Sequence, residues 1–223
     1  MTKKQIIQKL KDAFAKHLKV SPAFAAGLVP PSITDGKLYE AYVLSRVVEK
    51  LNNIENMTLT LVGGTKMKLK SSPGPINPAY PHIRLERNGG YVADLWTDVE
   101  FLALSYCSQG TSSPPTKGHY HELDLVVVEA GATGRPRYNQ IWLGVECKNT
   151  SYQKGLLKEI LGIRRELSLL SNVNKTCFNY WPRTSVPANP PSCLIVYSTD
   201  SGVTDYADPG SVFGIDFEYE PLV

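Results

Sequence analysis

The sequence lacks any apolar run that approaches the ~20 residues needed to cross a bilayer. It also lacks the apolar core of a signal peptide near residue 1. These two absences favour a cytoplasmic protein. The four cysteines lie far apart and form no CxxC pair, so we expect reduced thiols rather than a disulfide framework or a structural zinc cage. With 42% hydrophobic and 20% charged residues, the composition excludes a wholly disordered chain, a coiled coil and a collagen-like fibre.

The chain has 223 residues, enough for one domain or for one domain with an arm. Its net charge of +3 is unevenly distributed. Residues 1–20 contain six lysines and one acid, a charge of +5, which leaves −2 for the rest. This basic segment permits contact with a polyanion without requiring it. A solvated helix face explains the same charges.

Hydrophobic periodicity predicts helices over residues 2–20, 37–53 and 152–170. Prolines and glycines between residues 21 and 31 prevent the first helix from continuing. We therefore expect an N-terminal basic amphipathic helix and linker at residues 1–30 and a main domain at residues 31–223. The apolar stripe of the first helix consists of Ile7, Leu10, Phe14 and Leu18.

Strand patterns occupy most of the remaining chain, and the stretch 173–192 is expected to be loop. The two most apolar strands, 123–129 and 140–146, are joined by a hairpin-length connection, so they should be adjacent and antiparallel. The order of elements predicts an α/β fold with a central mixed β-sheet flanked by helices. The other predicted strands are 58–62, 65–70, 82–86, 91–104, 194–198 and 214–219.

Three charged residues interrupt the two most apolar strands. Asp124 lies in the first strand, and Glu146 and Lys148 point to one face at the end of the second. A carboxylate is costly to bury unless it is paired, hydrogen-bonded or bound to a metal. Two acids and one lysine leave one negative charge, which a divalent cation balances better than an internal ion network. Mg²⁺ is typically held by one or two carboxylates together with waters and phosphate oxygens.

Glu40 adds another acid, in the first turn of the second predicted helix. Steps of four and three lead from Glu40 to Leu44 and Val47, so it shares the core-facing stripe. It is either an acid that favours a helix N-terminus or an outer metal ligand that orients water. Asp98, on the strand predicted at 91–104, is interpreted as an edge-strand acid, with an additional metal ligand as the alternative.

These residues resemble the motif of the PD-(D/E)xK nuclease superfamily. An acid in a first helix (Glu40), an acid on a strand (Asp124) and the triplet Glu146-Cys147-Lys148 on the next strand occur in the expected order, followed by a helix. The resemblance covers roughly residues 37–200. It implies a restriction-endonuclease-like core and a PD-(D/E)xK-like nuclease domain over the main domain. The proline of the motif's name is replaced by leucine at residue 123, and no branch of the superfamily is indicated.

The resemblance also implies a catalytic set of Glu40, Asp124, Glu146 and Lys148. The three acids would bind Mg²⁺, for which Mn²⁺ can substitute, and Lys148 would position or activate the attacking water. The implied protein is a Mg²⁺-dependent endonuclease that hydrolyses phosphodiester bonds of nucleic acid, most simply DNA, in restriction or phage defence. Concerted cutting of two strands needs two active sites, most simply in a homodimer. The first helix is a candidate for the dimer contact, and packing onto its own domain is the alternative.

Four basic residues are candidates for contacts with a nucleic-acid backbone: Lys68, Arg135, Lys154 and Arg164. Contacts of this kind fix position but carry no sequence information. Two other functions stay open. One is a non-catalytic nucleic-acid-binding or scaffold module on the same fold. The other is a metal-dependent hydrolase of a small molecule, which would need a deep apolar pocket.

Overall fold

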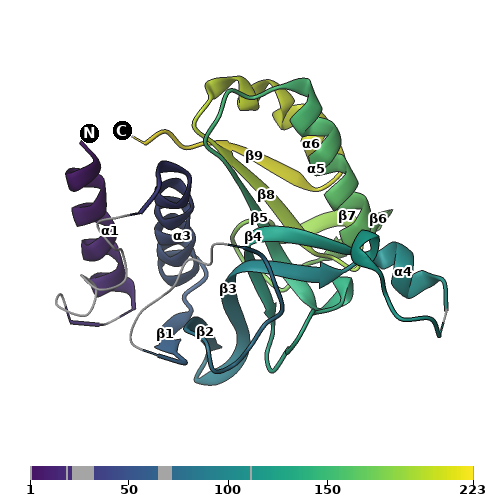
Figure 1. Ribbon diagram of the computed structural model, residues 1–223, viewed down its shortest axis with the longest axis horizontal. Coiled ribbons are helices and arrows are strands. Elements are labelled where there is room, and N and C mark those ends of the chain that lie inside the picture. Colours follow the sequence, from purple (N-terminus) through teal and green to yellow (C-terminus); the bar gives the residue numbers. More distant parts are fainter. Residues whose placement is uncertain (1, 19, 22–32, 65–71, 111, 223) are drawn as a thin grey trace.

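The structure, a computed structural model, describes residues 2–18, 20–21, 33–64, 72–110 and 112–222. It is an α/β fold in which helices flank a mixed seven-stranded sheet (Figure 1). The strand order is β1-β2-β3-β4-β5-β8-β9. The strands are β1 (Thr58–Val62), β2 (His82–Arg87), β3 (Gly90–Leu102), β4 (Tyr120–Glu129), β5 (Ile141–Lys148), β8 (Cys193–Ser198) and β9 (Ile215–Tyr219).

The helices lie on both faces of this sheet. A separate two-stranded sheet begins directly after the helix at Lys154–Leu167. The helices are α1 (Lys3–His17), α3 (Asp35–Asn53), α4 (Leu104–Ser108), α5 (Lys154–Leu167) and α6 (Ala207–Val212). The two strands of the small sheet are β6 (Leu169–Lys175) and β7 (Ser185–Asn189).

Antiparallel pairing runs from β1 through β5, and β8 and β9 then continue the sheet in parallel. The predicted adjacency of the two most apolar strands, β4 and β5, is confirmed. Asn88 and Gly89, at φ values of 52° and 77°, connect β2 to β3. Two successive positive φ values are the requirement of a tight hairpin turn. The strand predicted at 65–70 lies outside the described residues, and β1 pairs with β2.

Two apolar clusters cover the two faces of the sheet. Alternate residues of β4 belong to opposite clusters, with Leu125 and Val127 in the first and Val126 and Val128 in the second. The first cluster includes buried side chains of α1 and α3, and the second includes those of α5. Strand β4 is therefore buried on both faces, as its continuous apolar sequence predicts.

Helix α1 packs against α3, and the two lie side by side at the left of Figure 1. Its Leu10, Phe14 and the following Leu18 are buried in the cluster that contains the inner face of α3. The apolar stripe is therefore used within the chain, so the alternative of packing onto its own domain holds and this stripe is not free for a dimer contact. No helix in the described part of the chain is long and apolar enough to span a bilayer.

The expectation that residues 173–192 are loop is wrong in part, because β6 and β7 lie there. All but one of the residues of β6 are exposed, so the strand has neither the apolar alternation nor the burial that marks a strand in a sequence. Helix α3 begins where predicted, with the Thr34 side chain accepting a hydrogen bond from the N–H of Lys37. This cap fixes the first turn of α3, and Glu40 lies in the next turn.

Candidate metal centre

The site forms where β4 and β5 separate. Their pairing ends at Leu125 and Val145. Just beyond this pair, the N–H of Cys147, two residues after Val145, donates to Oδ2 of Asp124, one residue before Leu125, at 2.6 Å. The Asp124 carboxylate thus accepts the hydrogen bond that the Cys147 N–H would otherwise donate to the backbone of β4. The separation places a charged side chain between two buried strands without leaving a backbone donor unpaired.

Three carboxylates from different elements meet at this point. Glu40 of α3, Asp98 of β3 and Asp124 of β4 each offer an oxygen, and these oxygens lie within 4.8 Å of one another. Asp98 is 1% exposed and has φ of 51°. Register pairs flank it on both sides, Thr97 with Leu125 and Val99 with residue 123. Asp98 is therefore an interior residue at an irregularity of β3, and its interpretation as an edge-strand acid is wrong.

A lysine that the sequence analysis did not single out neutralises part of this cluster. The Nζ of Lys37 lies 2.6 Å from Glu40 Oε2 and 2.6 Å from Asp98 Oδ1. Lys37 lies one turn before Glu40 on α3, and its spacing of three residues from Glu40 is the only sequence signal of the contact.

Glu146 and Lys148 lie on the other side of Asp124 and line a cavity of about 430 Å³. The Nζ of Lys148 lies 3.0 Å from Glu146 Oε2 and 3.0 Å from Oε1 of Glu159, a residue of α5. Asp124 lines the same cavity and so joins it to the three-acid cluster. The cavity is lined by His121, Glu122, Asp124, Glu146, Lys148, Lys158, Glu159, Gly162 and Ile163.

Burial and mutual repulsion raise the pKa values of these carboxyl groups. Burial, and then the charge of Asp124, raise the pKa of Glu146 to about 8, against the opposing effect of Lys148. Burial raises the pKa of Glu40 to about 7; the hydrogen bond from Lys37 opposes this and Asp124 adds to it. Burial also raises the pKa of Asp124, although the N–H of Cys147 stabilises its charged form.

Lys148 is held in its charged form. Burial acts to lower its pKa, but the carboxylates of Glu146 and Glu159 outweigh burial and raise it above the ordinary value. Cys147, between the two catalytic candidates, has the opposite character. Burial, followed by the charges of Asp124 and Glu40, raises the pKa of its thiol, so it is a poor nucleophile.

The charge balance of the site fits a divalent cation. Four carboxylates (Glu40, Asp98, Asp124 and Glu146) face two lysines (Lys37 and Lys148). If all six of these described groups are ionised, they carry a net charge of −2 in a largely buried place. Carboxylate oxygens are the ligands that hard cations such as Mg²⁺ prefer, so the residues present fit the metal.

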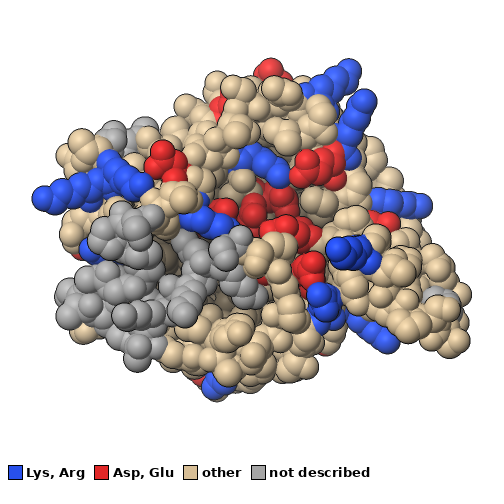
Figure 2. Space-filling model, viewed as in Figure 1, with Lys and Arg blue, Asp and Glu red and all other residues tan. Residues whose placement is uncertain are grey.

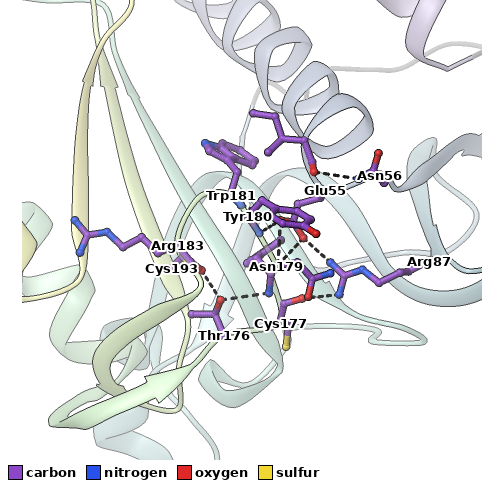
Figure 3. A network of polar contacts seen from close by, with 12 residues as sticks. Glu55, Asn56, Arg87, Thr176, Cys177, Asn179, Tyr180, Trp181, Arg183 and Cys193 are labelled. Atoms are coloured by element: carbon purple, nitrogen blue, oxygen red, sulfur yellow. Dashed lines mark hydrogen bonds and ion pairs between the residues drawn. The ribbon is translucent and has the colours of Figure 1, made fainter.

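Glu55 is a buried carboxylate outside the candidate site, and its hydrogen bonds and ion pair stabilise the fold (Figure 3). Its side chain is fully buried. It accepts hydrogen bonds from the backbone N–H groups of Asn179, Tyr180 and Trp181. Its Oε2 also forms an ion pair with Nη2 of Arg87 at 2.6 Å. One acid thus has four donors from the loop between β6 and β7 and from β2. In contrast, within the described residues Asp124 accepts one backbone N–H and Glu146 contacts one lysine.

The four residues proposed to contact a nucleic-acid backbone have different positions. Lys68 lies outside the described residues. Lys154 is exposed at the start of α5. Arg135 forms an ion pair with Glu100 at 2.7 Å and stacks on Tyr120, with its guanidinium carbon 4.5 Å from the ring centroid.

The fourth, Arg164, is corrected by the structure. It is 3% exposed and donates to the carbonyl and hydroxyl oxygens of Ser192 at 2.8 and 2.7 Å. A guanidinium in that position cannot reach a phosphate at the surface. Its spacing explains the error, because Arg164 follows Ile160 by four residues and precedes Leu167 by three, on the buried side of α5.

Figure 2 shows acidic side chains gathered near the centre of one face, with lysine and arginine side chains around them. Comparison with protein-family models, with curated proteins and with solved structures gives no match to this chain. The function is therefore inferred from the residues of the site and their chemistry.

Proposed function

We propose that the protein is a Mg²⁺-dependent endonuclease that hydrolyses phosphodiester bonds of nucleic acid, most simply DNA, on a restriction-endonuclease-like core. One observation carries this proposal. A buried acid of β3 and half-buried acids of α3 and β4 meet at the point where β4 separates from β5, and Glu146 and Lys148 of β5 line the adjoining cavity. A role in restriction or phage defence, in the cytoplasm, belongs to the same proposal.

Asp124, Glu40 and Asp98 would hold the metal, with Glu146 as a further ligand across the cavity. When bound, Mg²⁺ would supply neutralisation of the phosphate oxygens and of the leaving alkoxide. The acids must lose their protons to act as ligands, so metal affinity should increase with pH through the range in which Glu40 and Glu146 titrate.

Lys148 would position the attacking water and the phosphate. Its pKa is raised, so the ammonium group stays charged at neutral pH and donates hydrogen bonds rather than accepting a proton. Glu146 and Glu159 hold the Nζ from two sides at 3.0 Å each, which limits its movement. Its positive charge then lies where negative charge develops on the phosphorus oxygens.

Exposed lysines next to the cavity are suitable for holding the backbone of the substrate. Lys158 lines the cavity, and Lys154 lies one turn earlier on α5. Such contacts would make binding depend on salt and would not select a sequence. The homodimer proposed for concerted double-strand cutting has no assigned surface, because the α1 stripe is buried within the chain.

The test is cleavage of supercoiled plasmid by purified protein in Mg²⁺ and in EDTA. We expect Mg²⁺-dependent nicking or linearisation that Asp124→Asn abolishes. Glu129→Gln is the matched control, since Glu129 is an exposed acid at the other end of the same strand. Plasmid binding without cleavage in Mg²⁺ would favour the non-catalytic module. Hydrolysis of a small phosphodiester without any plasmid cleavage would favour the small-molecule hydrolase.

A further inference from the structure

A second cavity, of about 260 Å³, lies further along β3 and is separate from the acidic one. Five side chains with rings or charges line it: His82 and Arg84 from β2, and Tyr91, Asp94 and Trp96 from β3. None of these residues lines the acidic cavity or belongs to the three-acid cluster. The proposed nuclease chemistry does not use any of them.

Planar groups form the walls of this second cavity. The rings of His82 and Trp96 are stacked, with centroids 4.0 Å apart and planes 13° apart. The guanidinium carbon of Arg84 lies 4.6 Å from the centroid of the Tyr91 ring. The Tyr91 hydroxyl donates to Asp94 Oδ2 and accepts from the N–H of Gly131 at 3.0 Å. These contacts fix the planes of the side chains, so the site is built before a ligand arrives.

Several polar atoms of these walls have no hydrogen-bond partner in the described part of the structure: Asp94 Oδ1, Trp96 Nε1 and Arg84 Nε. Asp94 and Trp96 are 3% and 2% exposed. Buried polar atoms of this kind normally have partners, because an unmet hydrogen bond is costly. The three atoms belong to side chains that line the cavity, so one unpartnered acceptor and two unpartnered donors border the place where a ligand would lie.

His82 does not satisfy Asp94. Its Nδ1 lies 2.8 Å from the carbonyl oxygen of Tyr80, which can only accept, so Nδ1 carries a proton. The other ring nitrogen, Nε2, lies 3.6 Å from Asp94 Oδ1, beyond hydrogen-bond distance. The Oδ1 atom thus stays available to a donor that enters the cavity.

We propose that this cavity binds a nucleobase that carries an exocyclic amino group. The amino group would donate to Asp94 Oδ1, and a ring carbonyl or ring nitrogen would accept from Trp96 Nε1 or Arg84. A simple anion would be repelled by Asp94, and a simple cation would leave the two donors unmet. The volume is below the ~300–1,000 Å³ of typical small-molecule sites, which suits one planar heterocycle and not a larger cofactor.

The base can belong to a free nucleotide or to a nucleic-acid strand. Asp94 and Trp96 lie four and two residues from Asp98 on β3, about 13 and 7 Å along an extended strand. A base bound in this cavity would therefore have its own backbone within a few nucleotides of the acidic cluster. The binding itself does not depend on the proposed nuclease activity.

Calorimetric titration in EDTA, where no metal-dependent cleavage occurs, tests the proposal. The probes are dGMP, dAMP, dCMP and dTMP, with deoxyribose 5-phosphate as a baseless control. We expect the three amino-bearing nucleotides to bind and dTMP to bind about tenfold more weakly or worse, since it cannot donate an amino hydrogen bond to a charged group. Equal binding of all four, binding equal to that of the baseless sugar phosphate, or no binding at millimolar concentration would overturn the proposal.

Two substitutions locate the binding. Trp96→Phe keeps a ring but removes the donor, and Asp94→Asn removes the charge, so each should weaken dGMP binding about tenfold. Trp142→Phe, on β5 and outside the cavity, should leave it unchanged. Affinity unaltered in both cavity variants would contradict the assignment. Single-stranded oligonucleotides that bind more tightly than the mononucleotide would identify a strand as the source of the base, and equal affinities would identify a free nucleotide.

Discussion

Replacing Glu146 by glutamine should change how stability depends on pH. The carboxyl group of Glu146 is 5% exposed and its pKa is raised to about 8 from 4.5, first by burial and then by Asp124. An acid with a raised pKa in the folded state costs nothing below its unfolded pKa. The cost grows as pH rises and is complete above the folded pKa. Metal-free wild-type protein should therefore lose stability between pH 6 and pH 9, and Glu146→Gln should lose less.

The size of the effect follows from the same pKa values. At about 1.4 kcal/mol for each pH unit, the raised pKa of Glu146 costs the folded state, relative to the unfolded state, about 2 kcal/mol at pH 6 and about 5 kcal/mol at pH 9. The difference of about 3 kcal/mol corresponds to roughly 6–12 °C in melting temperature for a chain of this length. Glu40, with a pKa of about 7, adds to the pH dependence of both proteins and cancels in the comparison.

The assay is thermal unfolding in EDTA at several pH values from 6 to 9. The advantage of Glu146→Gln over wild type should grow with pH. Glu159→Gln is the control, because Glu159 contacts the same Lys148 Nζ at 3.0 Å but its side chain is 50% exposed. Adding Mg²⁺ should raise the wild-type melting temperature more at pH 9 than at pH 6, because the ligands are then deprotonated. A constant difference between Glu146→Gln and wild type across this range would refute the reasoning.

Three further predictions concern catalysis and the fold. Lys148→Ala should abolish plasmid cleavage while DNA affinity, measured by filter binding, changes little; retained cleavage in Mg²⁺ with a large fall in melting temperature would assign Lys148 a structural role only. Glu55→Ala should cost about 3–5 kcal/mol in urea unfolding, since its donors lose a fully buried acceptor; a cost below 1 kcal/mol would contradict this. Arg164→Ala should destabilise by a similar amount while the exposed neighbour Arg165→Ala changes stability by less than about 0.5 kcal/mol; equal losses of DNA affinity in both would contradict the structural assignment of Arg164.

The sequence predicts the fold well where periodicity and burial agree. Strands β4 and β5 are mostly apolar because both faces are covered, and a hairpin-length connection makes them antiparallel. The α3 helix is predicted by its apolar stripe. Strand β6 is not predicted, because almost all of its residues are exposed in a small separate sheet. Periodicity reports burial, so an exposed strand leaves little trace in a sequence.

The candidate site is predicted only in part, for a related reason. Asp124, Glu146 and Lys148 are visible because charge is unexpected in an apolar strand. Asp98 is only an alternative ligand in the sequence, because an irregularity in β3 with φ of 51° sets the direction of its side chain, and alternation cannot anticipate an irregular position. Lys37 reaches Asp98 across 61 residues of sequence, and no local pattern encodes that contact.

The charges of the candidate site can be compared between the sequence and the structure. Three charged residues on two strands leave one surplus negative charge in the sequence. Glu40, which the sequence also indicates, adds an acid from α3, and the structure adds Asp98 from β3 and Lys37 from α3, so the net charge of these described groups becomes −2. Each added carboxylate makes a purely internal ion network harder to sustain, because a buried charge without a partner is costly. Glu55 shows that this fold can supply four donors to one acid where no external cation is needed. Among the described residues, Asp124 accepts one backbone N–H and Glu146 contacts one lysine, fewer donors than Glu55 has, and a divalent cation fits the oxygen chemistry and burial of such acids.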